Sequence, residues 1–578
     1  MGGFFLHIDR LNEGIESKNF IRANRLSETI FRKRGLELGK TIVRDGFTLQ
    51  LFKKVYAAQV HLMEFENNDF ICYTGTLIYN RKTGNEALGE FYSDFISGTD
   101  YDQKLTGEYC MIIFTNNKLY LIKEYLDCYP AYTESKRRYY SSSFLNVFYQ
   151  LENFSISRNE LYEFVLLGLN FSSQTFIKEI VDLENGVEHE LLSGKFRKRN
   201  FGTGVDLRNH TRKESLEIVS NQLKELAGIY KNLYGNSITT ALSGGYDSRL
   251  IVAMLRSVGI TPEIYVYGSN DHMDVKIAKE IAIGEHFDLD HRVKASNTEI
   301  PDESYYQHLE THFYFNGGVN NTSVFDNGSS RLLKLDRASK AELQLNGVLG
   351  EIYRNGAIPF FIDRAKLSYH KFFTARYDSF DYSIFGAAFD KKEYRSTIID
   401  KIKYLLNSER DYLNREEFLS LLPVIRSKFA KANNETNQLL TGALFPYASP
   451  VLVKTSYSLS FAWKRYGMFQ ADLLRILDPK LANYNSQYGY NFASKPALKY
   501  RIKNQMKAHV PVAIRPYLRS KKVTDIEKGE LFIPEFLTGE LVKRACLRDY
   551  IDYTKIDHEE KLARVLSVEI LLQKIFKP

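Results

Sequence analysis

A pair of glycines between a predicted strand and a predicted helix restricts the possible folds of this chain more than any other feature. Residues 237–242, SITTAL, have the composition of a buried strand, and residues 250–259, LIVAMLRSVG, have the pattern of a helix that Gly259 closes. A second strand at 263–267 and a second helix through 275–283 follow. Alternating strands and helices are typical of a parallel sheet with right-handed crossovers, whose ligands bind at the carboxyl ends of the strands.

The turn between the first strand and helix, SGGYDS at residues 243–248, has the composition of an anion-binding loop. Gly244 and Gly245 let a ligand approach the backbone, consecutive amide groups form a nest for an anion, and the helix directs its positive end at the same point. The loop also supplies two hydroxyl donors, Ser243 and Ser248. A carboxylate does not bind a phosphate directly, so Asp247 implies a bridging Mg²⁺ ion. The alternative is a plain glycine turn in which Asp247 caps the helix.

The spacing S-G-G-x-D-S resembles the PP-loop of enzymes that cleave ATP to AMP and pyrophosphate, and it differs from the Walker A loop. Within that group the chain is similar to the asparagine-synthetase family, and the resemblance covers most of the sequence. In this family the loop holds the pyrophosphate while a substrate oxygen attacks the α-phosphorus of ATP. The resemblance also implies an adenine-side strand that includes Val266, Tyr267 and Gly268.

A second stretch, NGVLGEIYRNG at residues 346–356, is similar to the family's S-G-x-G-x-D-E loop, which lies over the nucleotide and supplies a second metal-binding acid. Asn346 and Gly347 stand where the family has its Ser-Gly pair, and Glu351 is the only acid in the stretch. The resemblance implies that Glu351 and Asp247 are catalytic residues that together hold Mg²⁺ and pyrophosphate. The alternative is a surface turn.

The N-terminal third of the chain resembles a class II glutamine amidotransferase domain of the N-terminal-nucleophile fold. Three stretches carry this resemblance: YTGTLIYN at 73–80, LTGEYCMIIF at 105–114 and KEYLDCYPAYT at 123–133. Where the family has a cysteine after the initiator methionine, this chain has Gly2, and where the family has an oxyanion-stabilising asparagine, it has Thr74. Glycine carries no nucleophile, so we expect no glutaminase activity.

These stretches divide the chain into three expected parts. Residues 1–205 are expected to form an α+β, β-rich sandwich like that of N-terminal-nucleophile hydrolases, in which two apolar runs joined by residues 115–117 pair as a hairpin. Residues 206–365 are expected to form an α/β PP-loop domain with a parallel sheet. Residues 366–578 are expected to form a mainly helical continuation of that domain.

Composition is consistent with a protein of several parts that works in the cytoplasm. The 578 residues exceed what one core accommodates, and no apolar run is long enough to span a membrane. The four cysteines are scattered, which fits a reducing compartment, and Cys72, Cys110 and Cys128 are expected in the core. A net charge of +8 is modest for this length, and no nucleic-acid partner is expected.

One segment is strongly basic. Residues 479–524 contain ten Lys or Arg and no Asp or Glu. The simpler interpretation is a solvated helical surface. The alternative is peripheral contact with an anionic substrate, such as pyrophosphate, a diphosphate-linked sugar lipid at a membrane surface, or a peptide. The family resemblance places a catalytic lysine in this region, for which Lys495 and Lys499 are candidates.

Together these features predict an ATP-dependent enzyme that adenylates a carboxylate and passes it to ammonia or a substrate amine. The resemblance favours a specialised pathway, such as surface-polysaccharide or peptide natural-product biosynthesis, with a small-molecule, peptide or glycan carboxylate as substrate. Two alternatives remain open: a non-catalytic ATP-binding scaffold, and a PP-loop enzyme that modifies tRNA. The second lacks support because no RNA-binding module is evident.

Overall fold

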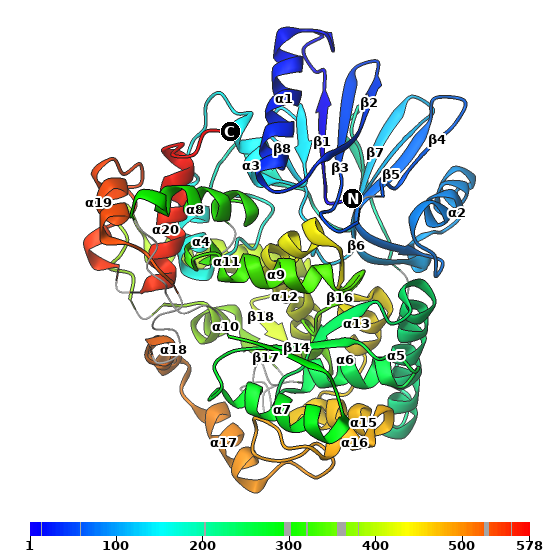
Figure 1. Ribbon diagram of the computed structural model, residues 1–578. Coiled ribbons are helices and arrows are strands. Elements are labelled where there is room, and N and C mark those ends of the chain that lie inside the picture. The colour runs from blue at the N-terminus through cyan, green and yellow to red at the C-terminus, as the bar shows by residue number, and fades with distance from the viewer. Residues whose placement is uncertain are drawn as a thin grey trace.

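The structure is a computed structural model that describes residues 1–12, 14–57, 59–201, 204–293, 302–319, 322–354, 366–379, 381–524, 531–556 and 558–578. The predicted boundary at 365/366 and the last two residues of the 346–356 stretch, Asn355 and Gly356, therefore touch positions outside the described residues. Figure 1 shows a β-rich part that contains the N-terminus, a separate smaller sheet, and helices around and between them.

Two antiparallel sheets form the N-terminal part. The first has the strand order β10-β8-β9-β1-β3-β2, with the bounds Ile180–Asp182, Tyr132–Glu134, Tyr139–Ser141, Gly3–Ile8, Phe47–Phe52 and Leu38–Arg44. The second has the order β12-β11-β7-β6-β5-β4, with the bounds Lys195–Lys198, Val187–Glu190, Lys118–Lys123, Leu105–Thr115, Phe70–Tyr79 and Leu62–Glu64. The predicted hairpin is confirmed: β6 and β7 pair across Asn116 and Asn117, whose φ angles of 50° and 57° suit a tight hairpin turn.

The two sheets pack face to face, as the sequence predicts for a sandwich. Their inner faces share one apolar cluster, in which Phe4 and Leu49 of the first sheet meet Cys72 and Ile112 of the second. Helix α1, Lys18–Lys33, covers the outside of the first sheet through Phe31, and helix α2, Gly84–Ser97, covers the second. A helix–sheet–sheet–helix arrangement results.

A five-stranded parallel sheet lies in the middle of the chain, as predicted. Its order is β15-β14-β13-β16-β19, with the bounds Leu289–Arg292, Glu263–Tyr267, Ile238–Ala241, Leu343–Leu345 and Gly442–Leu444. Three helices that pack near it are α5 (Arg212–Tyr234), α6 (Tyr246–Arg256) and α7 (Met273–Glu285). Helix α5 begins at a capping box in which Thr211 and Glu214 satisfy each other's backbone amides.

The rest of the chain is mainly helical, also as predicted. The helices not yet named are α3 Phe144–Tyr149, α4 Arg158–Leu167, α8 Asp302–Phe315, α9 Ser329–Ser339, α10 Tyr369–Arg376, α11 Lys391–Leu406, α12 Arg415–Leu440, α13 Pro450–Tyr457, α14 Phe461–Lys464, α15 Met468–Leu477, α16 Pro479–Asn483, α17 Leu498–His509, α18 Arg515–Thr524, α19 Glu535–Lys543 and α20 Glu559–Leu572. Two short strands, β17 Lys366–Ser368 and β18 Tyr412–Asn414, pair with each other. No helix in the described ranges is long and apolar enough to cross a membrane.

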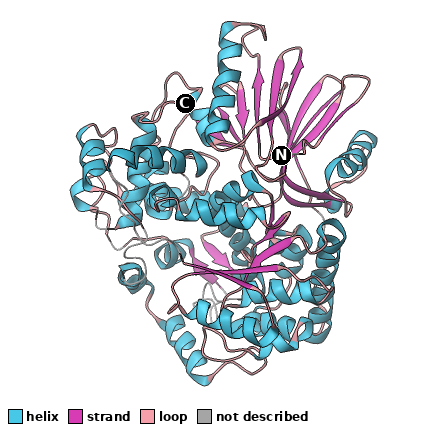
Figure 2. Cartoon of the chain, in the orientation of Figure 1, coloured by secondary structure: helices cyan, strands magenta, loops and turns pink. Residues whose placement is uncertain are grey.

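Packing crosses the predicted part boundaries at 205 and 365. Strand β19 belongs to the C-terminal stretch yet completes the parallel sheet beside β16. One large apolar cluster joins residues between 132 and 180 with helices α8, α10, α11, α12 and α20. Figure 2 shows the strands in two groups with helices between them. The three-part division therefore stays a prediction. Apolar clusters extend across both predicted boundaries, at 205 and at 365.

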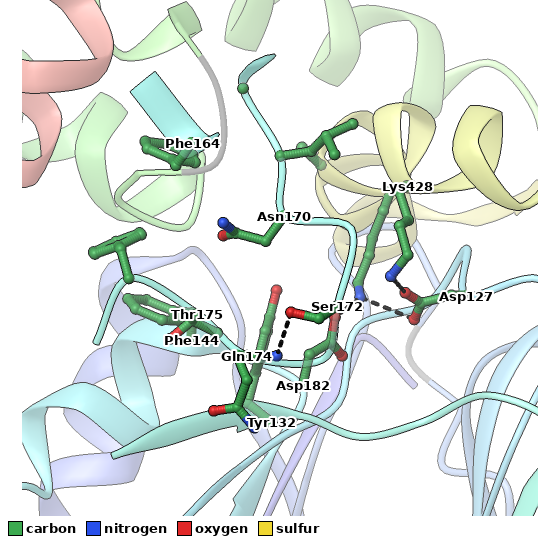
Figure 3. Close-up of a pocket in the computed structure, with 15 residues that line it drawn as sticks. Asp127, Tyr132, Phe144, Phe164, Asn170, Ser172, Gln174, Thr175, Asp182 and Lys428 are labelled. Carbon is green, nitrogen blue, oxygen red and sulfur yellow. Dashed lines mark hydrogen bonds and ion pairs between the residues drawn. The ribbon is translucent and has the colours of Figure 1, made fainter. Parts of the chain in front are cut away.

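A buried ion cluster fixes the sandwich to helix α12. Asp127 accepts from Lys428 Nζ at 3.1 Å and from Lys431 Nζ at 2.9 Å, beside a cavity of about 80 Å³ (Figure 3). Burial alone would raise the pKa of Asp127, but the surrounding lysines lower it below its ordinary value. A second buried pair joins Arg34 of the N-terminal part to Glu435 at 2.6 Å.

Candidate functional site

The SGGYDS turn lies where the sequence predicts it, between the carboxyl end of β13 and the start of α6. Gly245 is the residue before the helix, and no side chain caps the helix there. The Gly244 amide donates to Asp274 Oδ1 at 2.8 Å, and a β-carbon at Gly244 would lie 2.7 Å from Ile277 Cδ1, so this position requires glycine. The uncapped first turn of α6 offers amide donors to an anion.

The two serines of the turn hold each other in place. Ser243 Oγ lies 2.8 Å from Ser248 Oγ, and the Ser243 amide donates to Ser248 Oγ at 3.0 Å. The Gly245 amide donates to Ser243 Oγ at 3.3 Å. These contacts tie both ends of the loop together, so the loop is preorganised for a ligand.

The second loop follows β16, the strand next to β13 in the sheet. Gly347 and Gly350 pack against the first loop: a β-carbon at Gly350 would lie 2.2 Å from Asp247 Oδ1, and one at Gly347 would lie 3.1 Å from the Asp247 carbonyl carbon. Leu349 has a φ of 76°, in the left-handed region, at the place where the S-G-x-G-x-D-E pattern has its second glycine.

Both loops line one cavity of about 450 Å³. The structure brings together these predicted residues in its walls: Ser243, Gly245, Asp247, Ser248, Asn346, Gly347 and Glu351. Gly244, in the same loop, is not in the lining. The predicted adenine-side residues Val266, Tyr267 and Gly268 are not in this lining; they end the neighbouring strand β14 and begin the turn after it. Lys495 is exposed and also lies outside the lining.

Arginine side chains neutralise both predicted metal-binding acids. Arg354 Nη2 lies 2.5 Å from Asp247 Oδ2, and Gln470 Nε2 donates to Asp247 Oδ1 at 2.8 Å. Arg426 lies 3.0 Å from Glu351 Oε1. Burial alone would lower the pKa of Arg354, but the Asp247 carboxylate raises it above its ordinary value, so the guanidinium stays charged.

Asp247 and Glu351 are the donor set that the sequence predicts for a Mg²⁺ ion. Two carboxylates beside a phosphate site are the ligands that Mg²⁺ commonly uses. As arranged, however, Asp247 and Glu351 do not fit a metal ion, because their oxygens face arginine and amide donors. Within the described part of the chain, no group of three His, Cys, Asp or Glu side chains could hold a metal. The Mg²⁺ site stays a prediction.

Sequence reasoning missed the segment that holds the first loop from outside, residues 484–492. The Gln487 amide donates to the Gly244 carbonyl at 3.1 Å, and the Tyr246 ring stacks on Phe492 with ring centres 3.9 Å apart. Arg249, fully buried, donates to the Tyr484 carbonyl at 3.0 Å. The aromatic run YNSQYGYNF was the only local signal of this contact.

The sandwich offers no thiol in the position of an amidotransferase nucleophile. Gly2 stands where the family has its cysteine. A β-carbon at Gly2 would lie 3.1 Å from Leu36, and a β-carbon at Gly3 would lie 2.6 Å from the Phe31 ring. The sandwich cysteines Cys72, Cys110 and Cys128 are buried as predicted, and burial raises the pKa of each thiol.

No family model and no curated protein matches the sequence. Among solved structures 24 chains match. One is a glutamine phosphoribosylpyrophosphate amidotransferase from B. subtilis complexed with ADP and GMP, 12% identical, with 52% of this chain and 94% of that chain covered and a TM-score of 0.23. Another, described as the allosteric regulatory enzyme of purine biosynthesis, is 10% identical, with 52% and 67% covered and a TM-score of 0.23. Similarity this low carries no argument about function.

Proposed function

We propose that this chain is an ATP-dependent carbon–nitrogen ligase of the asparagine-synthetase kind. One observation carries the proposal: a serine- and glycine-rich turn at the carboxyl end of a parallel strand shares a cavity of about 450 Å³ with a second glycine loop from the neighbouring strand. Cavities at this edge of a parallel sheet are the usual place for a nucleotide. The serine hydroxyls and uncapped helix start suit its phosphates.

In the proposed reaction, a carboxylate oxygen of the substrate attacks the α-phosphorus of ATP. The bond between the α-phosphorus and its bridging oxygen breaks, and pyrophosphate leaves. An amine nitrogen then attacks the acyl carbon of the mixed anhydride, AMP leaves, and the nitrogen loses a proton. Arg354 and Arg426 line the cavity and supply positive charge where the leaving pyrophosphate accumulates negative charge.

The two acids that the sequence predicts as Mg²⁺ ligands are paired with arginine in this structure. Asp247 and Glu351 would hold the ion only with their arginine partners displaced, so the proposed reaction takes its positive charge from Arg354 and Arg426. Lys495, proposed as a catalytic lysine by family resemblance alone, would need to move from its exposed position to reach the cavity.

The amine donor is proposed to be ammonia or an amine of a second substrate. The positions Gly2 and Thr74 lack the nucleophile and the amide donor that the release of ammonia from glutamine requires. A small-molecule, peptide or glycan carboxylate is proposed as the acceptor.

Product analysis tests the proposal. The protein is incubated with ATP, with and without Mg²⁺, and with aspartate, a uronic-acid sugar nucleotide or a peptide, each with ammonia or glutamine. We expect AMP and pyrophosphate only when a carboxylate is present. We expect the amide product to form with ammonia and not with glutamine. Release of ADP and phosphate instead would exclude an acyl-adenylate.

A specific observation favours a second candidate, an ATP-binding protein without catalysis. Both acids expected to hold the metal are paired with arginine, which removes the free carboxylates of an ordinary PP-loop site. This candidate predicts ATP binding that Mg²⁺ does not strengthen, and no AMP with any carboxylate.

A further inference from the structure

Helix α17, Leu498–His509, has no buried residue, although it contains a run of large apolar side chains. Leu498, Ile502 and Met506 are 68%, 51% and 68% exposed. They are spaced four residues apart, so they lie above one another on a single face of the helix. A continuous exposed apolar stripe of this kind marks a surface that meets another phase or partner.

A stripe of cations runs beside the apolar one. Lys499, Lys503 and Lys507 are also spaced four residues apart and are all exposed, and each follows an apolar residue by one position. Arg501 lies on the opposite side of the apolar stripe. No acid occurs anywhere in residues 479–524, so the formal charges within the segment are all positive.

Exposed apolar side chains continue from α17 into the start of helix α18. Ile514, which ends the short turn before α18, and Tyr517 and Leu518 in the first turn of α18 are 45%, 38% and 46% exposed. Figure 1 shows α17 at the end of the molecule opposite the sandwich, with α18 beside it. Helix α17 therefore presents apolar and basic side chains at one extremity of the protein, and the start of α18 adds exposed apolar side chains next to it.

The remaining side of α17 holds the helix to the candidate site. Tyr500 contacts the rings of Tyr488 and Tyr490, with ring centres 5.5 Å and 5.3 Å apart. Tyr466 donates to Gln505 Oε1 at 3.4 Å. Tyr488 also lines the cavity between the two glycine loops, so the exposed face and the cavity share a wall residue.

We propose that the face formed by α17 and the start of α18 binds an anionic phospholipid surface. An amphipathic helix lies in such a surface with its apolar stripe among the acyl chains and its lysines against the headgroups. The arrangement of Leu498, Ile502 and Met506 beside Lys499, Lys503 and Lys507 matches both requirements at once. Contact with a nucleic-acid backbone would use the cations and leave the apolar stripe without a role.

Vesicle binding tests this inference without any nucleotide, so its failure is distinct from failure of the proposed ligase activity. The full chain is mixed with phosphatidylcholine vesicles that contain or lack phosphatidylglycerol, and the bound fraction is measured after sedimentation. We expect binding only to the anionic vesicles, and weaker binding as salt rises.

Two triple variants separate the two stripes. We expect L498S/I502S/M506S and K499E/K503E/K507E each to weaken binding to anionic vesicles by about tenfold or more. Since all six side chains are exposed, neither variant should disturb folding, which circular dichroism checks.

Matched triples elsewhere on the surface serve as controls. L11S/F196S/L332S and K118E/K178E/K195E replace exposed residues of the same kinds, and both should bind vesicles as the parent does. The proposal is overturned if the parent does not bind anionic vesicles at low salt, or if the control triples weaken binding as much as the α17 triples. It is equally overturned if the α17 triples lose binding to a short RNA while their vesicle binding is unchanged.

Discussion

At the scale of single residues, side chains and backbone from several distant segments of the chain contact Asp247. Arg354 and Gln470 each donate to one of its oxygens, and the Tyr447 hydroxyl donates to its backbone carbonyl at 2.9 Å. At Gly350 a side chain would collide with the carboxylate. Asp247, which the sequence predicts as a metal ligand, thus serves in this structure as a partner of three distant segments.

The Asp247–Arg354 pair predicts a non-additive effect on stability. We expect Asp247→Ala to lower the free energy of unfolding by about 2 kcal/mol, because the Arg354 guanidinium is left without its carboxylate. The double variant Asp247→Ala/Arg354→Ala should cost less than the sum of the two single changes. Denaturant titration of all four proteins measures the coupling, and strict additivity would show that the pair does not form.

At the scale of elements, strands and helices with strong local signals could be predicted from the sequence. The strand–glycine–helix unit and the hairpin at residues 115–117 depend on patterns within a few residues. Strand β19 could not be predicted, since three residues show no periodicity. Gln470 reaches Asp247 across 223 positions, and only tertiary packing decides such a contact.

The last residue of helix α14, Lys464, predicts a pH effect on stability. This lysine is fully buried, donates to the Ser456 carbonyl at 2.8 Å, and has its pKa lowered to about 7 by burial. Its folded pKa lies below the ordinary value of 10.5, so its contribution to stability rises with pH from about 7 to 10.5 and is lost as pH falls.

Replacing Lys464 with methionine should therefore raise the free energy of unfolding at pH 7 and flatten its pH dependence by up to about 1.4 kcal/mol per pH unit. The Ser456 carbonyl keeps the Leu459 amide as a donor at 3.3 Å. Chemical denaturation at pH 7 and pH 10 measures the change. The exposed Lys213→Met variant should retain the parent's slope, and a steeper slope in Lys464→Met would contradict the prediction.

For the whole molecule, the sandwich and the parallel-sheet part are joined by shared apolar packing and by buried ion pairs. The cluster around Asp127 and the Arg34–Glu435 pair both cross this junction. Since the parts share cores, we expect the chain to unfold in a single cooperative transition.

Asp127→Ala tests this coupling. The change should lower the free energy of the whole transition by about 3–5 kcal/mol, because it leaves buried lysines unpaired. Asp206→Ala, which breaks an exposed pair with Arg208, should leave the transition close to that of the parent. Calorimetry that resolved two transitions, with Asp127→Ala lowering only one, would show that the parts unfold independently.

The most direct test of the central claim is the affinity for ATP of a variant with the cavity blocked. Gly245 lines the cavity and has a φ of −87°, so Gly245→Val can place a side chain in the phosphate position without backbone strain. Gly539, which has open space around it, gives the control Gly539→Val. Isothermal titration calorimetry should show ATP binding to the parent and to Gly539→Val, and binding at least about tenfold weaker to Gly245→Val. Equal affinity in all three proteins, or no binding by the parent, would contradict the nucleotide site.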